Sequence, residues 1–139
     1  MAGDKFVVGH VGDSRMYRCR NNRLQQLTRD HTYLSEVLGK ESINSANLRK
    51  HSVGHAISRA VGGEENLSLD IIRGQMVLGD QYLLCSDGLT DMLQDSVIEG
   101  VLSSRIELPM KVETLVNMAN SAGGHDNITV VVSEVGDQI

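Results

Sequence analysis

The sequence predicts an α+β domain built from layered, largely antiparallel sheets. Two observations support this fold class. Strand-like segments come in groups joined by short turns, and helical segments stand between or after these groups instead of alternating with single strands. With 139 residues, 40% of them hydrophobic, the chain suits one domain with one core. We therefore expect residues 1–139 to form a single domain.

Three strands are expected near the start of the chain. Residues 5–11 form an apolar run, and residues 15–20 continue after a Gly-Asp break. Asn21 and Asn22 predict a tight turn, so the segments on either side form a hairpin. A short strand that ends at Leu27 completes this group.

The middle of the chain carries weaker signals. A helix over residues 32–38 is expected to end at Gly39. Residues 41–63 are polar with little periodicity, which is typical of a surface excursion. His51 and His55 are four residues apart, but no Glu follows His51 as the zinc-protease motif requires, so we do not expect zinc there.

The second half predicts two strands, two helices and a final strand. Apolar residues alternate over 67–71, and residues 81–86 form an apolar strand. One helix is expected over residues 95–103. A second follows Pro109, with apolar side chains at the i, i+3, i+4 and i+7 positions of one face. The chain then closes with a strand over residues 127–135.

Composition excludes several function classes. A net charge of −5, 3% aromatic residues and no Trp argue against binding of nucleic acid or of anionic membranes. No apolar run approaches the length that spans a bilayer, and no signal peptide is visible. Cys19 and Cys85 lie in strand-like runs without a metal-site spacing, which predicts a reduced, cytoplasmic protein.

One acidic stretch organises the chain. The apolar strand over residues 81–86 delivers Asp87, and Gly88 lets the backbone turn sharply beside it. Asp91 follows at the expected start of a helix. Such an arrangement holds a metal or a reacting group rigidly, although an ordinary Asp-Gly turn is the simpler alternative.

Two further aspartates stand at comparable places. Asp13 follows the first strand and Asp126 precedes the last, each with glycine close by. If these strands are neighbours, Asp13, Asp87 and Asp126 converge on one end of a sheet. Clustered carboxylates repel one another unless a cation neutralises them, and ligands that are all oxygen favour Mg²⁺ or Mn²⁺.

Four motifs resemble those of the metal-dependent protein serine/threonine phosphatases of type 2C, and most closely the bacterial branch. In chain order they are VGDSR (11–15), LTRDH (27–31), LCSDGLTD (84–91) and GHDNITV (124–130). A weaker motif, ISRAVG (57–62), belongs to the same pattern. The motifs keep the family's order, and the resemblance covers residues 5–135.

The resemblance implies a four-layer α-β-β-α fold, with two antiparallel sheets face to face and helices outside. It implies two or three Mn²⁺ or Mg²⁺ ions at one end of the sandwich and a metal-activated water that attacks phosphoserine or phosphothreonine in a protein substrate. Residues 41–63 would occupy the place of the family's flap beside the active site.

Site residues follow position by position from the same resemblance. Asp87 and Asp126 match ligands of the main metal site, and Asp13 with Asp87 matches the site of a further metal. Asp91 resembles an acid that supports this second site through water. Two more residues would support the ligands: Asn127, which orients Asp126, and Gly88.

The departure from the family is the N-terminal part, which carries an Arg that grips phosphate and an Asp-Gly-x-Gly-Gly turn that bridges two metals. Neither is found in this sequence. We therefore expect an incomplete domain, its C-terminal part, which self-associates through exposed sheet edges. Two functions remain open: a phosphatase, or a non-catalytic module that binds a regulatory or phosphoprotein partner.

Overall fold

The structure is a computed structural model that describes residues 3–32, 57, 59–61 and 68–137. Apart from Thr32, the helix expected over residues 32–38 lies outside the described residues. So do His51, His55 and most of the flap-like segment over residues 41–63.

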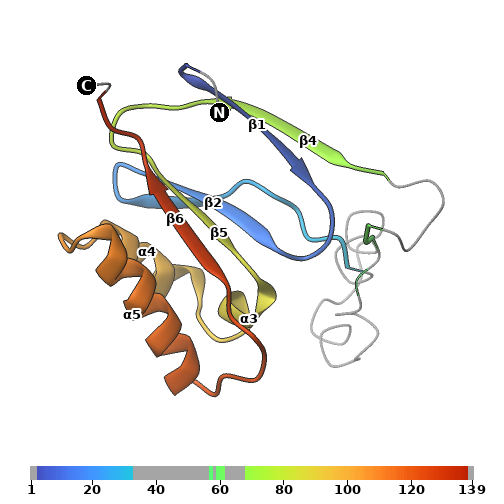
Figure 1. Cartoon of the computed structure of the whole chain (residues 1–139), viewed down its shortest axis with the longest axis vertical. Coiled ribbons are helices and arrows are strands. Elements are labelled where there is room, and N and C mark those ends of the chain that lie inside the picture. Colours follow the sequence, from blue (N-terminus) through green and yellow to red (C-terminus); the bar gives the residue numbers. More distant parts are fainter. Residues whose placement is uncertain (1–2, 33–56, 58, 62–67, 138–139) are drawn as a thin grey trace.

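The described residues form two antiparallel sheets, as the sequence predicts (Figure 1). The strands are β1 (Lys5–His10), β2 (Arg15–Arg20), β3 (Arg23–Gln26), β4 (Asp70–Gln75), β5 (Gln81–Cys85) and β6 (Val130–Glu134). β1 pairs with β4 in a two-stranded sheet, and the second sheet has the order β3-β2-β5-β6. The expected hairpin is present: β2 and β3 are joined by Asn21 and Asn22, whose φ angles are 51° and 60°. Two consecutive residues with positive φ are what a two-residue hairpin turn requires.

One strand is displaced from its predicted position. The alternation over residues 67–71 predicts a strand that ends where β4 is only beginning, since β4 runs from Asp70 to Gln75. The apolar alternation does not continue visibly to the end of β4, because Gly74 has no side chain. A Cβ at Gly74 would lie 2.6 Å from Cε1 of Phe6, its partner on β1, so the Phe6 ring fills the place of a side chain.

Three helices follow β5. They are α3 (Asp87–Thr90), α4 (Asp95–Ser103) and α5 (Leu108–Ser121), and Pro109 lies in the first turn of α5 as expected. The short α3 was not expected, and Asp91 lies at its C-terminal end instead of at the start of a helix. The last strand begins at Val130 and not at residue 127, because Ser86 forms hydrogen bonds with Thr129 in place of the regular strand ladder.

Two apolar clusters set the layers. The first fills the space between the four-stranded sheet and the helices, where Tyr17, Leu83, Ile98, Leu102 and Leu115 are completely buried. The second lies between the two sheets. Its buried members are Phe6, Met16 and Tyr82. The rings of Phe6 and Tyr82 meet edge to face, with centroids 5.4 Å apart.

The layer order is therefore helices, four-stranded sheet, two-stranded sheet (Figure 1). Antiparallel sheets with flanking helices are thus confirmed. Within the described ranges, no helix covers the outer face of β1 and β4, where the fourth layer of the expected fold would lie. Val7 and Ile71 on that face are 61% and 50% exposed. No helix in the described part of the chain is long and apolar enough to cross a membrane.

Candidate metal centre

Ser86 joins the end of β5 to the segment that precedes β6. Its backbone N–H donates to Thr129 O, and the N–H of Thr129 donates to Ser86 Oγ, both at 3.0 Å. The Ser86 hydroxyl donates in turn to Asn127 O at 3.4 Å. These bonds replace the regular ladder beyond the Cys85–Val130 pair, which is why β6 begins later than the sequence predicts.

Gly88 lets the start of α3 approach the same segment. Gly88 is buried, and a Cβ at this position would lie well inside contact distance of the Asn127 carbonyl oxygen and 3.0 Å from its carbon. A side chain therefore has no room here. This close approach brings Asp87, the first residue of α3, beside the loop that carries Asp126. Asp126 is exposed, and its Oδ1 accepts the backbone N–H of Asn127 at 2.7 Å.

Asp13 reaches the same region from the turn between β1 and β2. The turn depends on Gly12, whose φ of 102° favours glycine. β2 pairs with β5 so that Arg15 lies opposite Cys85, which places Asp13 near Asp87. Burial raises the pKa of Asp13, and the carboxylate of Asp87 raises it further.

The charge around Asp13 fits a cation. The charged groups that act on its pKa, Asp87 and Asp30, are both carboxylates. A divalent cation would relieve this repulsion, and an all-oxygen donor set suits Mg²⁺ or Mn²⁺. The structure thus places Asp13 beside Asp87 and places Asp87 beside the loop of Asp126, but it does not bring ligand oxygens of all three residues within 4.8 Å of one another.

Asp91 stands one helical turn beyond Asp87. Its backbone N–H donates to Asp87 O at 2.8 Å, which closes α3, and its side chain is exposed. Asp91 therefore lies one turn from Asp87, as the sequence predicts, but at the end of a helix and not at the start of one.

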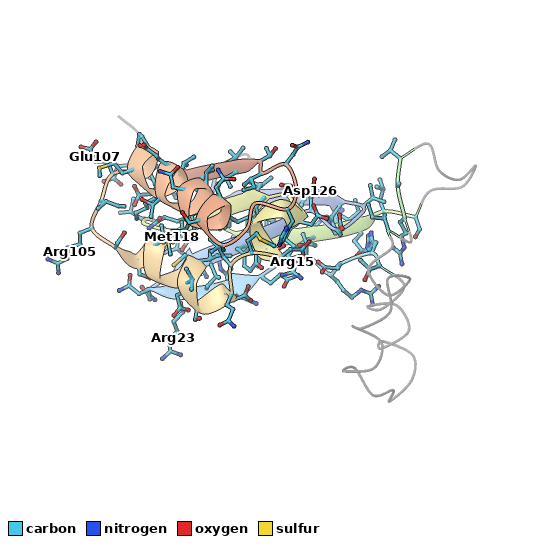
Figure 2. The ribbon with its side chains drawn as sticks, turned by 90° about the horizontal axis from the view of Figure 1, so that it is seen from below. Arg15, Arg23, Arg105, Glu107, Met118 and Asp126 are labelled. Carbon is cyan, nitrogen blue, oxygen red and sulfur yellow. The ribbon has the colours of Figure 1, made fainter. Side chains whose placement is uncertain are left out.

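Arg15 and Asp126 are labelled in Figure 2 at the same end of the four-stranded sheet. The Arg15 guanidinium makes a two-pronged ion pair with Asp30, at 2.9 and 2.7 Å, and also donates to Tyr17 Oη at 2.9 Å. Tyr17 in turn donates to Asp95 at 2.9 Å. Arg15 thus ties β2 to the loop of Asp30, and Tyr17 ties β2 to α4.

A second polar cluster adjoins the turn of Asp13, and sequence reasoning missed it. In the described ranges, His10, His31 and Asp70 form the one group of three or more His, Cys, Asp or Glu side chains with potential ligand atoms all within 4.8 Å of one another. His10 and His31 belong to the motif regions around VGDSR and LTRDH, but Asp70 lies in the expected strand over residues 67–71, outside all of the motifs.

A cleft of about 520 Å³ lies between the two sheets next to this centre. Its apolar lining includes Val8, Met16, Leu84 and Val131, and Ser86 also lines it. Leu84 belongs to a central strand, yet it is 45% exposed, and its neighbour Val131 is 54% exposed. Apolar side chains on the inner face of a sheet are normally covered, so Leu84 and Val131 form an unusually exposed apolar surface there.

Comparison with known proteins supports the resemblance. No family model matches the chain. A serine/threonine phosphatase, stp, from Listeria welshimeri is 39% identical over 134 residues, which cover 96% of this chain and 53% of that protein. The solved serine/threonine phosphatase of S. agalactiae superposes with a TM-score of 0.92 at 32% identity, over 97% of this chain and 56% of that one.

A PstP catalytic domain solved with two manganese ions superposes with a TM-score of 0.81 at 34% identity, over 99% of this chain and 56% of that one. The chain thus spans about half the length of these relatives. Over nearly its whole length, the chain is thus similar to bacterial serine/threonine phosphatases.

Proposed function

We propose that the chain holds divalent cations through Asp13, Asp87 and Asp126, and that this centre serves the hydrolysis of phosphoserine or phosphothreonine in proteins. The observation that carries the proposal is the register of β2 and β5, which places Asp13 beside Asp87. Burial raises the pKa of Asp13, and the Asp87 carboxylate raises it further. The kinship with phosphatases, one of them solved with manganese, supports it.

Each residue has a separate part in this proposal. Asp87 and Asp126 would hold Mn²⁺ or Mg²⁺ in the main site, and Asp13 with Asp87 would hold a further ion. Asp91 would support that ion through water. Gly88 and Asn127 keep Asp87 and Asp126 together by the close approach described above. When bound, the cations would neutralise phosphoryl oxygens and lower the pKa of water.

We further propose that the chain is the C-terminal part of a single phosphatase domain. Its match to about half of the relatives' length supports this, as does the cleft with exposed Leu84 and Val131. The missing part would fill the cleft and supply the phosphate-gripping arginine and the bridging acid. Without it, we expect the chain to self-associate through its sheet edges.

The substrate would be a phosphorylated protein, and the location cytoplasmic. The free, buried Cys19 and Cys85 fit a reducing compartment. A non-catalytic module remains the second candidate, but the three aspartates and the close approach of Gly88 to Asn127 favour the catalytic function.

The test is hydrolysis of a phosphothreonine peptide with excess Mn²⁺. The chain is assayed alone and mixed with the segment of the Listeria welshimeri relative that it does not match. We expect little activity alone and activity from the mixture, abolished by Asp87→Asn and kept by Asp137→Asn. No activity from a mixture that forms a stable complex would contradict the catalytic proposal and favour the binding module.

A further inference from the structure

Two buried histidines hold the turn of Asp13 from both sides. Nδ1 of His31 accepts a hydrogen bond from the backbone N–H of Gly12 at 3.0 Å, and the backbone N–H of His31 donates to Gly12 O at 2.8 Å. Nε2 of His10 donates to Ser14 O at 2.7 Å. Asp13 therefore lies between two residues that are each anchored to an imidazole.

Asp70 fixes the tautomer of His31. Because Nδ1 of His31 accepts a hydrogen bond, its Nε2 carries the proton, and it donates to Asp70 Oδ2 at 2.7 Å. Nη1 of Arg59 lies 3.3 Å from Asp70 Oδ1, which adds positive charge to the carboxylate. His10 lies opposite Asp70 in the β1–β4 pair, so the cluster joins this sheet to the turn of Asp13.

The same cluster is a poor metal site. A cation on Nε2 of His31 would displace its proton while Nδ1 still accepts the Gly12 N–H, which leaves a charged imidazolate. The Arg59 guanidinium beside Asp70 would also repel the cation. The cluster therefore acts through its hydrogen bonds.

We propose that His31 and His10 are positioning residues, which hold the Asp13 turn in the geometry that brings its carboxylate to Asp87. The inference rests on the proposed function, because it gives the turn a metal to bind. Nδ1 of His10 is buried and has no partner among the described residues. Burying an unpartnered nitrogen costs folding free energy. We take the hydrogen bond from Nε2 of His10 to Ser14 O as the gain that offsets this cost.

Paired substitutions test each nitrogen separately. The amide oxygen of asparagine stands close to the position of Nδ1, and the amide nitrogen of glutamine close to that of Nε2. His31→Asn and His10→Gln therefore keep the anchoring bond, whereas His31→Leu and His10→Leu remove it. Asp80→Asn is the matched control, because Asp80 is a buried partner of Arg20 and Tyr82 at the other end of the fold.

Two measurements on the full chain separate the hydrogen bonds from the two histidines to the Asp13 turn, here called the brace, from metal binding. Hydrogen exchange at the Gly12 amide reports the brace without any metal. The midpoint of a Mg²⁺ titration, followed by the NMR shift of the Ser14 amide, reports the metal site. We expect His31→Leu to lose Gly12 protection and to raise the Mg²⁺ midpoint about 10-fold or more, and His31→Asn to stay close to wild type in both. His10→Leu and His10→Gln should differ in the same way at the Mg²⁺ midpoint.

Three results would overturn the inference. If both leucine variants fold and keep the wild-type Mg²⁺ midpoint, the histidines do not position Asp13, while the proposed metal site stands. If the asparagine and glutamine variants lose affinity as the leucine variants do, or Asp80→Asn does, the effect is general destabilisation. If Mg²⁺ shifts no amide near Asp13 in the wild type, the proposed metal site itself fails and the inference with it.

Discussion

Replacing Gly88 with alanine tests how closely α3 packs against the loop that carries Asp126. The new Cβ would lie 3.0 Å from the Asn127 carbonyl carbon and closer still to its oxygen, and 3.4 Å from Cγ1 of Ile128. Carbon atoms pack best at about 3.5–4.0 Å, so the Asn127 backbone must move by about 0.5 Å or more. Because backbone stands on both sides of the contact, no side-chain rotation relieves it.

The expected loss is about 1–3 kcal/mol of unfolding free energy, the usual range for overpacking a well-packed site. Gly100→Ala is the matched control. Gly100 is exposed within α4, and a Cβ there would meet nothing within 4 Å. Glycine in a helix interior is less favourable than alanine, so Gly100→Ala should gain about 0.5–1 kcal/mol. The same glycine-to-alanine change is thus expected to lower the free energy of unfolding at position 88 and to raise it at position 100.

Urea unfolding followed by circular dichroism measures both effects. For a domain of this size, 1 kcal/mol also corresponds to about 4 °C in the melting temperature, which gives an independent check. If Gly88→Ala is as stable as Gly100→Ala, the Asn127 carbonyl does not pack against Gly88. The start of α3 would then not be held against the loop that carries Asp126.

Three further predictions concern charge, reactivity and association. Burial alone would raise the pKa of Asp80, but hydrogen bonds from Arg20, Val77 N–H and Tyr82 together lower it. Its contribution to stability is therefore present above about pH 4 and lost as the pH falls below that. In acid unfolding, Asp80→Asn should flatten the stability profile below pH 4, and an unchanged slope would contradict this. Burial raises the pKa of Cys85 to about 12, so iodoacetamide at pH 8 should label it only after unfolding; native labelling at the rate of a free thiol would refute this. Exposed Leu84 and Val131 predict concentration-dependent association by light scattering, and a stable monomer at high concentration would count against it.

The sequence predicted best where side chains are read locally. The Asn21-Asn22 turn needs only its own backbone, and the apolar face of α5 needs only its own spacing. Both predictions are confirmed. Asp13, Asp87 and Asp126 were predicted to converge on one end of a sheet if their strands are neighbours. The register of β2 and β5 places Asp13 beside Asp87, but the ligand oxygens of the three residues do not all lie within 4.8 Å of one another.

Predictions failed where a distant neighbour decides the local structure. The Phe6 ring takes the place of a side chain at Gly74, so the pattern of β4 is broken in the sequence. The late start of β6 depends on Ser86 and Gly88, which lie some forty residues away. The brace of the Asp13 turn depends on Asp70, which belongs to another strand of the fold. Such contacts leave no periodic signal in a single sequence.

The most direct test of the proposed metal centre is Mn²⁺ binding by the chain itself, measured by electron paramagnetic resonance of the free ion. We predict that Asp87→Asn and Asp13→Asn weaken binding about 10-fold or more, because each removes a proposed ligand. Asp137→Asn removes the same charge from an exposed position beyond β6 and should leave the affinity unchanged. If Asp87→Asn binds Mn²⁺ as Asp137→Asn does, the carboxylates at the end of the sheet are not a metal centre.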